Sequence, residues 1–506
     1  MFLRLNSICL SAFLFASSSA VARADIVLYT VPLDQLIATK SPRTGPPRIR
    51  SPRTTLTIPI QGKTTVNPGK TVTFRHPRFG TLYFALENVR IYELPTTESL
   101  AAQRLSVAIR QNDADQVMEA ARWCLHHGLL SKFYEAVGKV LEINPQHTEA
   151  LHVAALKRRM DVPIGSSSDQ EAELRKFVSK ADMKFKASKH FILMHDTPDE
   201  PAPNHTMPRA DERLELLETV YESFLLRFYS QGVELEIPRE PLKAVLFSDY
   251  RHFLDFAKRL SPELGSAAGF WTKAENVSVF FDQGTHESFA PLKQLTEQMQ
   301  QMKEAAPDNV TPRTKDIVRM AGTFALLLEI AQENSDIEVV SHEATHQMAG
   351  NTGLMPRHVL TPTWAAEGLA TYFESPHDAA WSGIGAVNKQ RLHSYRDLQR
   401  DRQHSDIGFI VGDQIFTQAQ TNDAALYAYG QSWALTHFLM EKRFDELMTY
   451  YRRLGEMPPD VILAPELLDK VFTEVFGKDR TRLDSDWRTY MRTLKTDLEK
   501  IVDERR

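Results

Sequence analysis

Two histidines four residues apart, with a glutamate directly after the first, constrain this 506-residue chain more than any other feature. They lie in the stretch Ser341-His342-Glu343-Ala344-Thr345-His346-Gln347. Residues four apart on a helix share one face, so His342 and His346 can direct two imidazoles at one metal ion. Glu343 could then reach a water bound to that ion, as in the H-E-x-x-H pattern of zinc sites. The alternative is a surface helix that carries two ordinary histidines.

A second stretch, Thr363 to Ala370, offers the missing third ligand. Its Glu367 would complete a site of two histidines and one carboxylate, with a fourth position left open. We therefore predict Zn²⁺ as the cofactor. The predicted ligands are His342, His346 and Glu367, and Glu343 is the predicted general base.

The sequence before the histidines predicts where their helix begins. Ser335 to Glu338 has the form of a capping box, and Asn334 is a second candidate for the N-cap of this helix. We therefore expect a separate helix over Thr314 to Glu333, followed by the metal helix, which Gly350 ends. One face of the metal helix should be buried, because it carries the apolar residues Ile337, Val340, Ala344 and Met348.

The two motifs together carry a family resemblance. His342-Glu343-x-x-His346 followed by Trp364-x-x-Glu367-Gly368-x-Ala370 resembles the gluzincin clan of zinc metallopeptidases, and the second motif is similar to a helix of M1-type aminopeptidases. From Phe185 onward the chain resembles an uncharacterised family of exported bacterial peptidase-MA-like proteins, predicted to be zinc proteases. The resemblance implies an α+β, mainly helical fold, whose zincin catalytic domain has a mixed-sheet lobe and a helical lobe.

The resemblance also implies a reaction and an oxyanion donor. Zinc would activate a water to hydrolyse a peptide bond, and Glu343 would move the proton. M1-type enzymes hold the oxyanion with a tyrosine, and Tyr429 in Tyr429-Gly430-Gln431-Ser432 matches that pattern loosely. Tyr427 is the reserve and His437 a weaker candidate. The alternative is that Tyr429 only packs in the core.

Two departures from the family patterns matter. Some gluzincins place an acid one turn after the third ligand, but here that position is Thr371 and the nearest acid is Glu374. The partner that orients the zinc histidines is therefore unassigned. The amine-anchoring G-x-M-E-N segment of aminopeptidases is also missing, which favours an endopeptidase and leaves an unusual amidase open.

The resemblance implies that an edge strand pairs with extended substrate. Our candidate is the strand Val277 to Phe281, in which Val277 and Val279 would be the substrate-binding residues. The alternative is that these apolar residues only pack the sheet.

The N-terminus has the form of a secretory signal peptide. Arg4 precedes a short apolar run, and Ala22-Arg23-Ala24 is an A-x-A cleavage site. We expect residues 1–24 to be removed near Ala24 and the protein to be exported, periplasmic or extracellular. No later segment has the length and apolarity of a membrane helix. A formal charge of −5 gives no reason to expect nucleic acid as a partner.

We divide the rest of the chain into three units. Residues 25–95 form a small β-rich unit, which includes a basic Pro-rich segment at 40–53 that is a docking loop or simply a solvated loop. Residues 98–165 resemble tetratricopeptide-type helical hairpins, which could bind a partner protein or bridge to the next unit. Residues 161–180 read as a linker, and residues 181–506 form the metallopeptidase domain.

The sequence is compatible with two functions. The first is an exported zinc metallopeptidase, most simply an endopeptidase, that acts on a peptide or protein substrate. The second is a non-catalytic, zinc-containing protein that binds partners or serves as a scaffold. Glu343 favours the first, because a purely structural zinc site has no use for a base beside the metal.

Overall fold

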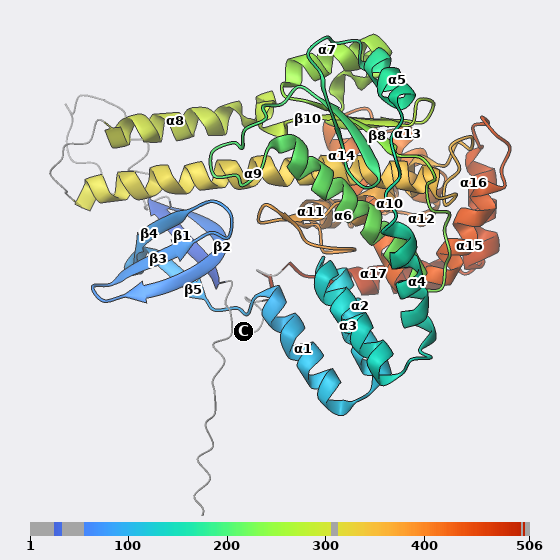
Figure 1. Cartoon of the computed structure of the whole chain (residues 1–506), viewed down its shortest axis with the longest axis horizontal. Helices are drawn as coiled ribbons and strands as arrows, with labels where there is room; N and C mark the ends of the chain where they lie inside the picture. Colours follow the sequence, from blue (N-terminus) through green and yellow to red (C-terminus); the bar gives the residue numbers. More distant parts are fainter. Residues whose placement is uncertain (1–24, 33–54, 305–311, 497–498, 501–506) are drawn as a thin grey trace, which may run out of the picture.

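The computed structural model describes residues 25–32, 55–304, 312–496 and 499–500. The chain is a mixed α+β protein in which helices predominate (Figure 1). The predicted signal peptide and the basic segment at 40–53 lie outside the described residues. Among the described residues, no helix combines the length and apolar composition that a membrane crossing requires.

The first unit is an antiparallel sheet with the strand order β4-β3-β2-β1-β5. Its strands are β1 (Asp25–Pro32), β2 (Thr55–Asn67), β3 (Thr71–Arg75), β4 (Thr81–Ala85) and β5 (Val89–Tyr92). Phe74 and Phe84 of this unit are fully buried. They share a hydrophobic core with Met320 and Phe324 of a long helix described below. The β-rich unit therefore has no separate core.

Four consecutive helices follow in the region of the second unit. Its helices are α1 (Thr97–Gln111), α2 (Ala114–His126), α3 (Leu130–Ile143) and α4 (Thr148–Met160). The expectation of a linker over 161–180 is wrong in part, because α5 (Ser168–Val178) occupies most of it. Ser167 and Gln170 form a capping box there, and Leu174 and Val178 are buried.

A five-stranded mixed sheet follows, in the order β6-β7-β8-β10-β9. It contains β6 (Lys184–Ala187), β7 (Phe191–His195), β8 (Leu242–Phe247), β9 (Gly269–Thr272) and β10 (Val277–Phe281). The helices α6 (Arg209–Tyr229) and α7 (Tyr250–Leu260) connect its strands.

The expectation that Val277 to Phe281 forms a sheet edge is wrong. β10 pairs with β8 on one side and with β9 on the other, so its backbone groups are already used. The side chains of Val277 and Val279 are buried as well, which leaves them no surface to offer a substrate. The edge strand beside β10 is β9. All five residues of this strand are buried, and its nearly continuous apolar sequence, Val-Ser-Val-Phe-Phe, is typical of an interior strand.

The predicted break before the metal helix does not exist. A single 40-residue helix, α9 (Pro312–Asn351), replaces the two helices that we expected. Asn334 lies inside it and accepts a hydrogen bond from the backbone of Ala379 instead of capping a new helix. The predicted apolar face is confirmed, because Ile337, Val340, Ala344 and Met348 are all buried.

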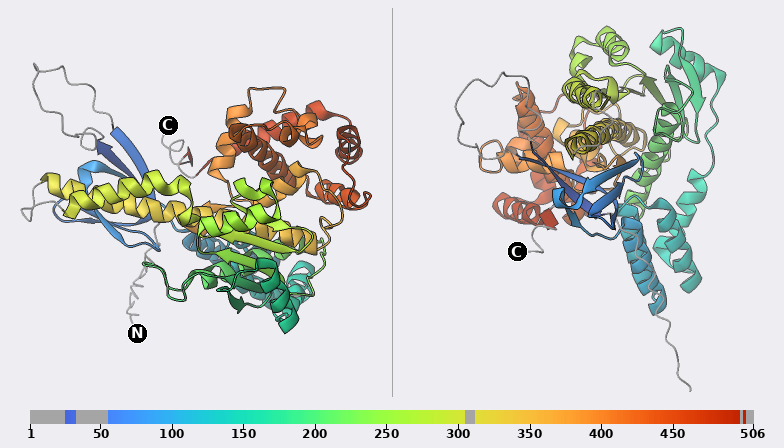
Figure 2. Two further views of the ribbon diagram at one scale, coloured as in Figure 1. Left: turned by 90° about the horizontal axis from the view of Figure 1, so that it is seen from above. Right: turned by 90° about the vertical axis from the view of Figure 1, so that its left-hand side faces the viewer.

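The long helix therefore spans two neighbourhoods (Figure 1). Its first half packs beside α8 (Ala290–Glu304) and over the β-rich unit, and this hairpin projects from the rest of the molecule (Figure 2). Its second half lies on the mixed sheet and also packs against the helical lobe. The lobe contains α10 (Thr363–Phe373), α11 (Lys389–Leu398), α12 (Ile407–Val411), α13 (Gln414–Thr417), α14 (Asn422–Lys442), α15 (Phe444–Gly455), α16 (Pro465–Phe476) and α17 (Arg480–Thr493).

One buried side chain fixes the second half of α9 to the sheet. The amide of Gln347 donates to the backbone oxygens of Lys243 and Asn276, each at 3.0 Å. Its oxygen accepts from the hydroxyl of Ser278 at 3.1 Å. Because Gln347 follows His346 directly, these bonds also set the rotation of α9 that turns the histidines away from the sheet.

We expect Gln347→Leu to lower the free energy of unfolding by about 1–3 kcal/mol, because two partly buried carbonyls lose their donor. Denaturant unfolding measures this change. The matched control is Gln301→Leu at an exposed position of α8, which should stay within about 0.5 kcal/mol of the parent. An equal effect of the two substitutions would contradict the anchoring role.

Candidate metal centre

Two neighbouring helices bring the three predicted ligands together. Nε2 of His342 lies 3.0 Å from Glu367 and 3.1 Å from Nε2 of His346. Nε2 of His346 lies 3.5 Å from the other oxygen of Glu367. His342, His346 and Glu367 are thus a group that could hold a metal ion.

The donor set fits a zinc ion. Two ligands bonded to one tetrahedral zinc at about 2.0–2.2 Å lie roughly 3.3–3.6 Å apart, close to the separations here. Two imidazole nitrogens and one carboxylate are also ligands that zinc prefers. All three side chains are half-buried, so the remaining side of the group stays accessible.

Glu374 orients the first histidine, and it is the partner that the sequence left unassigned. Its Oε2 accepts from Nδ1 of His342 at 2.8 Å. With its proton on Nδ1, the ring directs a lone pair on Nε2 toward the ligand group when a metal is bound, the arrangement typical of metal-binding histidines. Glu374 lies at the C-terminal end of α10, which carries Glu367.

Glu374 is in turn held by two residues that the sequence gave no reason to select. Nε of Arg391 donates to Oε1 of Glu374 at 2.5 Å, and the Asn388 amide donates to the same oxygen at 3.3 Å. The guanidinium also reaches Glu338, one turn before His342, at 3.0 Å. Arg391 thereby bridges the buried Glu374 and the half-buried Glu338, which flank the first histidine.

Burial and charge shift the ionisation of this cluster. Burial disfavours the charged ring of His342, but its hydrogen bonds to Glu367 and Glu374 outweigh burial and raise its pKa well above the ordinary value. Burial opposes ionisation of both carboxylates. The neighbouring histidines nevertheless lower the pKa of Glu367, and Arg391 with His342 lowers the pKa of Glu374. Burial and the charge of Glu374 raise the pKa of Glu338 to about 7.

Glu343 lies beside the ligand group with its carboxylate unengaged. Among the described residues, none makes a hydrogen bond or an ion pair with that carboxylate. Burial raises the pKa of Glu343, and the two histidines offset only part of this effect. Gly269 of the edge strand β9 packs here, since a Cβ on it would lie 3.4 Å from Cγ of Glu343.

Tyr429 of α14 enters the site from the helical lobe. Its ring centroid is 6.2 Å from that of His342, and the Arg391 guanidinium lies 5.1 Å from the ring centre. The charge of Glu367, followed by burial, raises the pKa of Tyr429, so its hydroxyl stays protonated and can donate.

The two reserve candidates are placed less favourably. Tyr427 lies two residues before Tyr429 on α14, and residues two apart face different sides of a helix. His437 is buried, and its two ring nitrogens bond the oxygen of Gly385 and the hydroxyl of Tyr490. His437 therefore has no free nitrogen to offer at the metal group.

Two glycines allow the helices around the site to approach closely. A Cβ on Gly368, the residue after Glu367, would lie 2.1 Å from Oγ1 of Thr436 on α14. A Cβ on Gly430, the residue after Tyr429, would lie 2.7 Å from Cβ of Ser394 on α11. The glycine in each motif thus sets a helix contact, which brings Glu367, Tyr429 and Arg391 together.

A carboxylate distant in sequence fixes the start of α10. Asp413 accepts hydrogen bonds from the backbone nitrogens of Thr363 and Trp364 at 2.7 and 2.8 Å. A carboxylate at a helix N-terminus pairs with unsatisfied N–H groups and with the helix dipole. Asp413 lies between α12 and α13, so this turn supports the helix of the third ligand.

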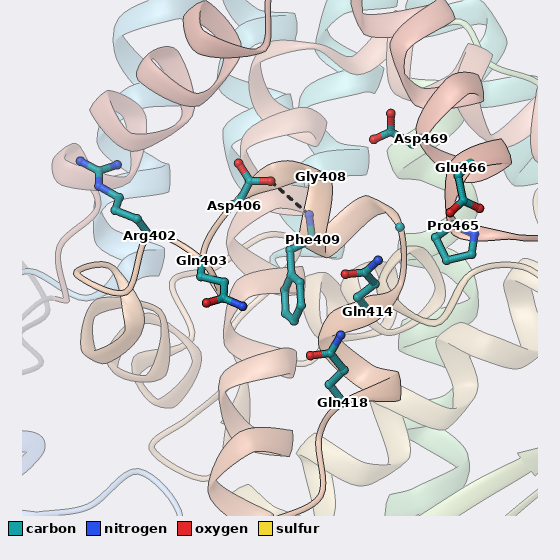
Figure 3. Close-up of a pocket in the computed structure, with 11 residues that line it drawn as sticks. Arg402, Gln403, Asp406, Gly408, Phe409, Gln414, Gln418, Pro465, Glu466 and Asp469 are labelled. Atoms are coloured by element: carbon teal, nitrogen blue, oxygen red, sulfur yellow. Dashed lines mark hydrogen bonds between the residues drawn. The ribbon is translucent and has the colours of Figure 1, made fainter.

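A polar hollow of about 630 Å³ lies on the outer side of that turn, between α12, α13 and the start of α16 (Figure 3). Asp406, Glu466 and Asp469 contribute acidic groups, and Arg402 a basic one. None of the metal-group residues lines it. This hollow is therefore separate from the metal group, which we identify by its converging ligand atoms.

A second group of possible ligand atoms, in His205, Glu212 and Glu333, has a different character. Arg209 and Arg213 bond Glu333 at 2.6 and 3.0 Å, so its charge is already compensated. We regard this second group as a buried ion-pair network.

The comparisons with known proteins yield one family match and assign no function. The model of a family described as a protein of unknown function (DUF1570) matches residues 336–460, and the chain is similar to it over that range. No curated protein and no solved structure matches the chain. The matched range includes His342, Glu367, Glu374, Arg391 and Tyr429, so it coincides with the metal group and its supports.

Metal binding should weaken as the pH falls. The pKa of metal-free His342 is raised, so zinc must displace a proton from its ring below that pKa. We expect the apparent Kd for zinc to rise by up to about tenfold for each unit that the pH falls below that pKa. Competition with a chelator at several pH values measures it.

The same measurement tests Glu374, and its control is a charge-removing substitution away from the site. Glu374→Gln should raise the zinc Kd about 10–100-fold, because it replaces the charged acceptor of Nδ1–H by a neutral and weaker one. Glu119→Gln, at an exposed position of α2, should leave the Kd unchanged. A zinc affinity that does not vary with pH would contradict the role of the His342 proton.

Proposed function

We propose that this protein is a zinc-dependent metallopeptidase with a gluzincin-like catalytic domain. The observation that carries the proposal is the joint position of an unengaged acid, Glu343, beside His342, His346 and Glu367. A structural site needs the ligands but not this base. The signal-peptide sequence supports the further proposal that the protein is exported.

A zinc ion, when bound, supplies a Lewis acid that lowers the pKa of a water and polarises a carbonyl oxygen. Glu343 then has the role of a general base. A raised pKa makes the carboxylate of Glu343 a stronger base toward the attacking water. The protonated carboxyl group would then carry that proton to the leaving amine.

Tyr429 has the role of oxyanion donor. Its hydroxyl stays protonated at neutral pH and belongs to a ring packed between His342 and Arg391. A donor held before the reaction stabilises the developing negative charge without reorganisation.

The edge strand β9 replaces Val277 and Val279 as the candidate for substrate pairing. It begins at Gly269, beside Glu343, and includes Trp271, whose indole packs against Gly350 of α9. A peptide added to this edge would pass along the helix that carries the histidines. Such pairing through backbone groups suits an endopeptidase that accepts extended chains.

The first test separates metal binding from catalysis. Glu343→Gln should keep stoichiometric zinc but lose at least about 100-fold in the rate of casein or peptide-library cleavage. His346→Ala should lose the zinc as well. Glu119→Gln is the matched control and should retain both. Normal cleavage by Glu343→Gln would disprove the mechanism, and wild-type protein without zinc would exclude the metal centre.

The second test concerns the tyrosine. Tyr429→Phe should reduce kcat about 100–1,000-fold with little change in zinc affinity, because only one transition-state hydrogen bond is lost. Tyr427→Phe is a matched control on the same helix and should retain kcat. A reversed result would assign the donor to Tyr427.

A further inference from the structure

We propose that Arg78, in the N-terminal β-rich unit, is a positioning residue for the metal centre and acts through the segment 375–388. This inference rests on the proposed function only in naming zinc as the ion. It gives the two N-terminal units a role at the site, although neither contributes a ligand to the group.

The segment 375–388 begins and ends at the residues that support His342. Glu374, which bonds Nδ1 of His342, immediately precedes it. Asn388, its last residue, caps α11 through Gln390 and Arg391 and also bonds Glu374. A displacement of the segment would therefore move both Glu374 and the helix that carries Arg391.

The β-rich unit holds the middle of this segment. Nη1 of Arg78, at the turn between β3 and β4, donates to the backbone oxygen of Ala379 at 2.5 Å. The same guanidinium reaches Glu333 at 3.4 Å and Glu212 at 3.2 Å. Arg78 thus ties the segment to α6 and α9 at once. Nearby, Nε2 of His76 lies 3.1 Å from a carboxylate oxygen of Asp378.

The helical module contacts the segment at a second point. Gly383 packs against the end of α2 so closely that a Cβ on it would lie 2.2 Å from the backbone oxygen of His126. The same Cβ would lie 2.5 Å from the backbone nitrogen of Gly128. Both N-terminal units therefore touch the segment between Glu374 and Arg391.

The backbone of the segment makes a tight turn at the contact with Arg78. Asp378 and Ala379 have φ values of +52° and +60°, a left-handed conformation that residues with a Cβ rarely adopt. Gly383 and Gly385 are left-handed too, at +101° and +61°. Asp378 and Ala379 join the short paired strands Pro376–His377 and Ala380–Trp381, and Arg78 and Asn334 add contacts on the two sides of Ala379.

The test measures zinc affinity in the full chain by competition with a chelator. Arg78→Met should raise the zinc Kd about tenfold, at the lower end of the effect of losing a partner that orients a ligand. Arg90→Met, at an exposed position of the same unit, is the matched control and should leave the Kd unchanged. Arg78→Lys keeps the charge but not the fork of donors, and should give an intermediate Kd.

A second pair of variants approaches the segment from the helical module. Gly383→Ala should also weaken zinc binding, because its Cβ would displace the segment from α2. Gly138→Ala is the control, because a Cβ there meets no atom within 4 Å. Melting temperatures of the chelator-treated proteins show whether each variant is folded, and Arg78→Lys decides the matter if Arg78→Met does not fold.

Hydrogen exchange separates this inference from the proposed function. In the metal-free protein, amides of residues 374–391 should exchange faster in Arg78→Met and Gly383→Ala than in their controls. This result would support the inference even if the wild type cleaved no peptide. Folded variants with wild-type exchange and zinc affinity would overturn it.

Discussion

A hydrogen bond of 2.8 Å between Nδ1 of His342 and Glu374 is the interaction on which the arrangement of this site depends. It leaves Nε2 facing Glu367 and His346, where all three donors can meet at one ion. Without it the ring could rotate or present its other nitrogen, and spacing along the helix alone would not assemble a ligand group. The carboxylate that makes this bond is buried, so it needs a counter-charge.

Arg391 supplies that counter-charge and links several parts of the lobe. It bonds Glu374 and Glu338 and lies against the ring of Tyr429. One buried guanidinium thus compensates two acids and fixes the tyrosine proposed as oxyanion donor. The position of Arg391 depends on Gly430, which lets α14 and α11 approach closely. The charge compensation at the site therefore depends on this helix contact.

The long helix α9 extends these constraints across the molecule. Its first half shares a core with the β-rich unit, and its second half carries the histidines and is fixed to the sheet by Gln347. A rigid helix of 40 residues therefore places the N-terminal unit in a defined relation to the metal group. The contacts of Arg78 and Gly383 with the segment after Glu374 add a second connection on the same side.

The sequence by itself determined the features that follow from local periodicity and composition. The four-residue spacing of His342 and His346 put both rings on one helix face, the apolar stripe fixed the buried face, and a short motif identified Glu367. The helical hairpins and most strands could also be predicted, because their patterns repeat over a few residues.

Only the tertiary structure decided which distant residues meet. Glu374 was known as the nearest acid but had no assigned partner, and nothing in the sequence selected Arg391 or Asp413, because each acts across a long gap in the chain. The capping signals at Asn334 and Ser335 were overridden, since packing against α8, the β-rich unit and the sheet stabilises one continuous helix. The strand order was also decided only by the tertiary structure. It depends on which backbones pair, and this pairing makes β9 the edge strand instead of β10.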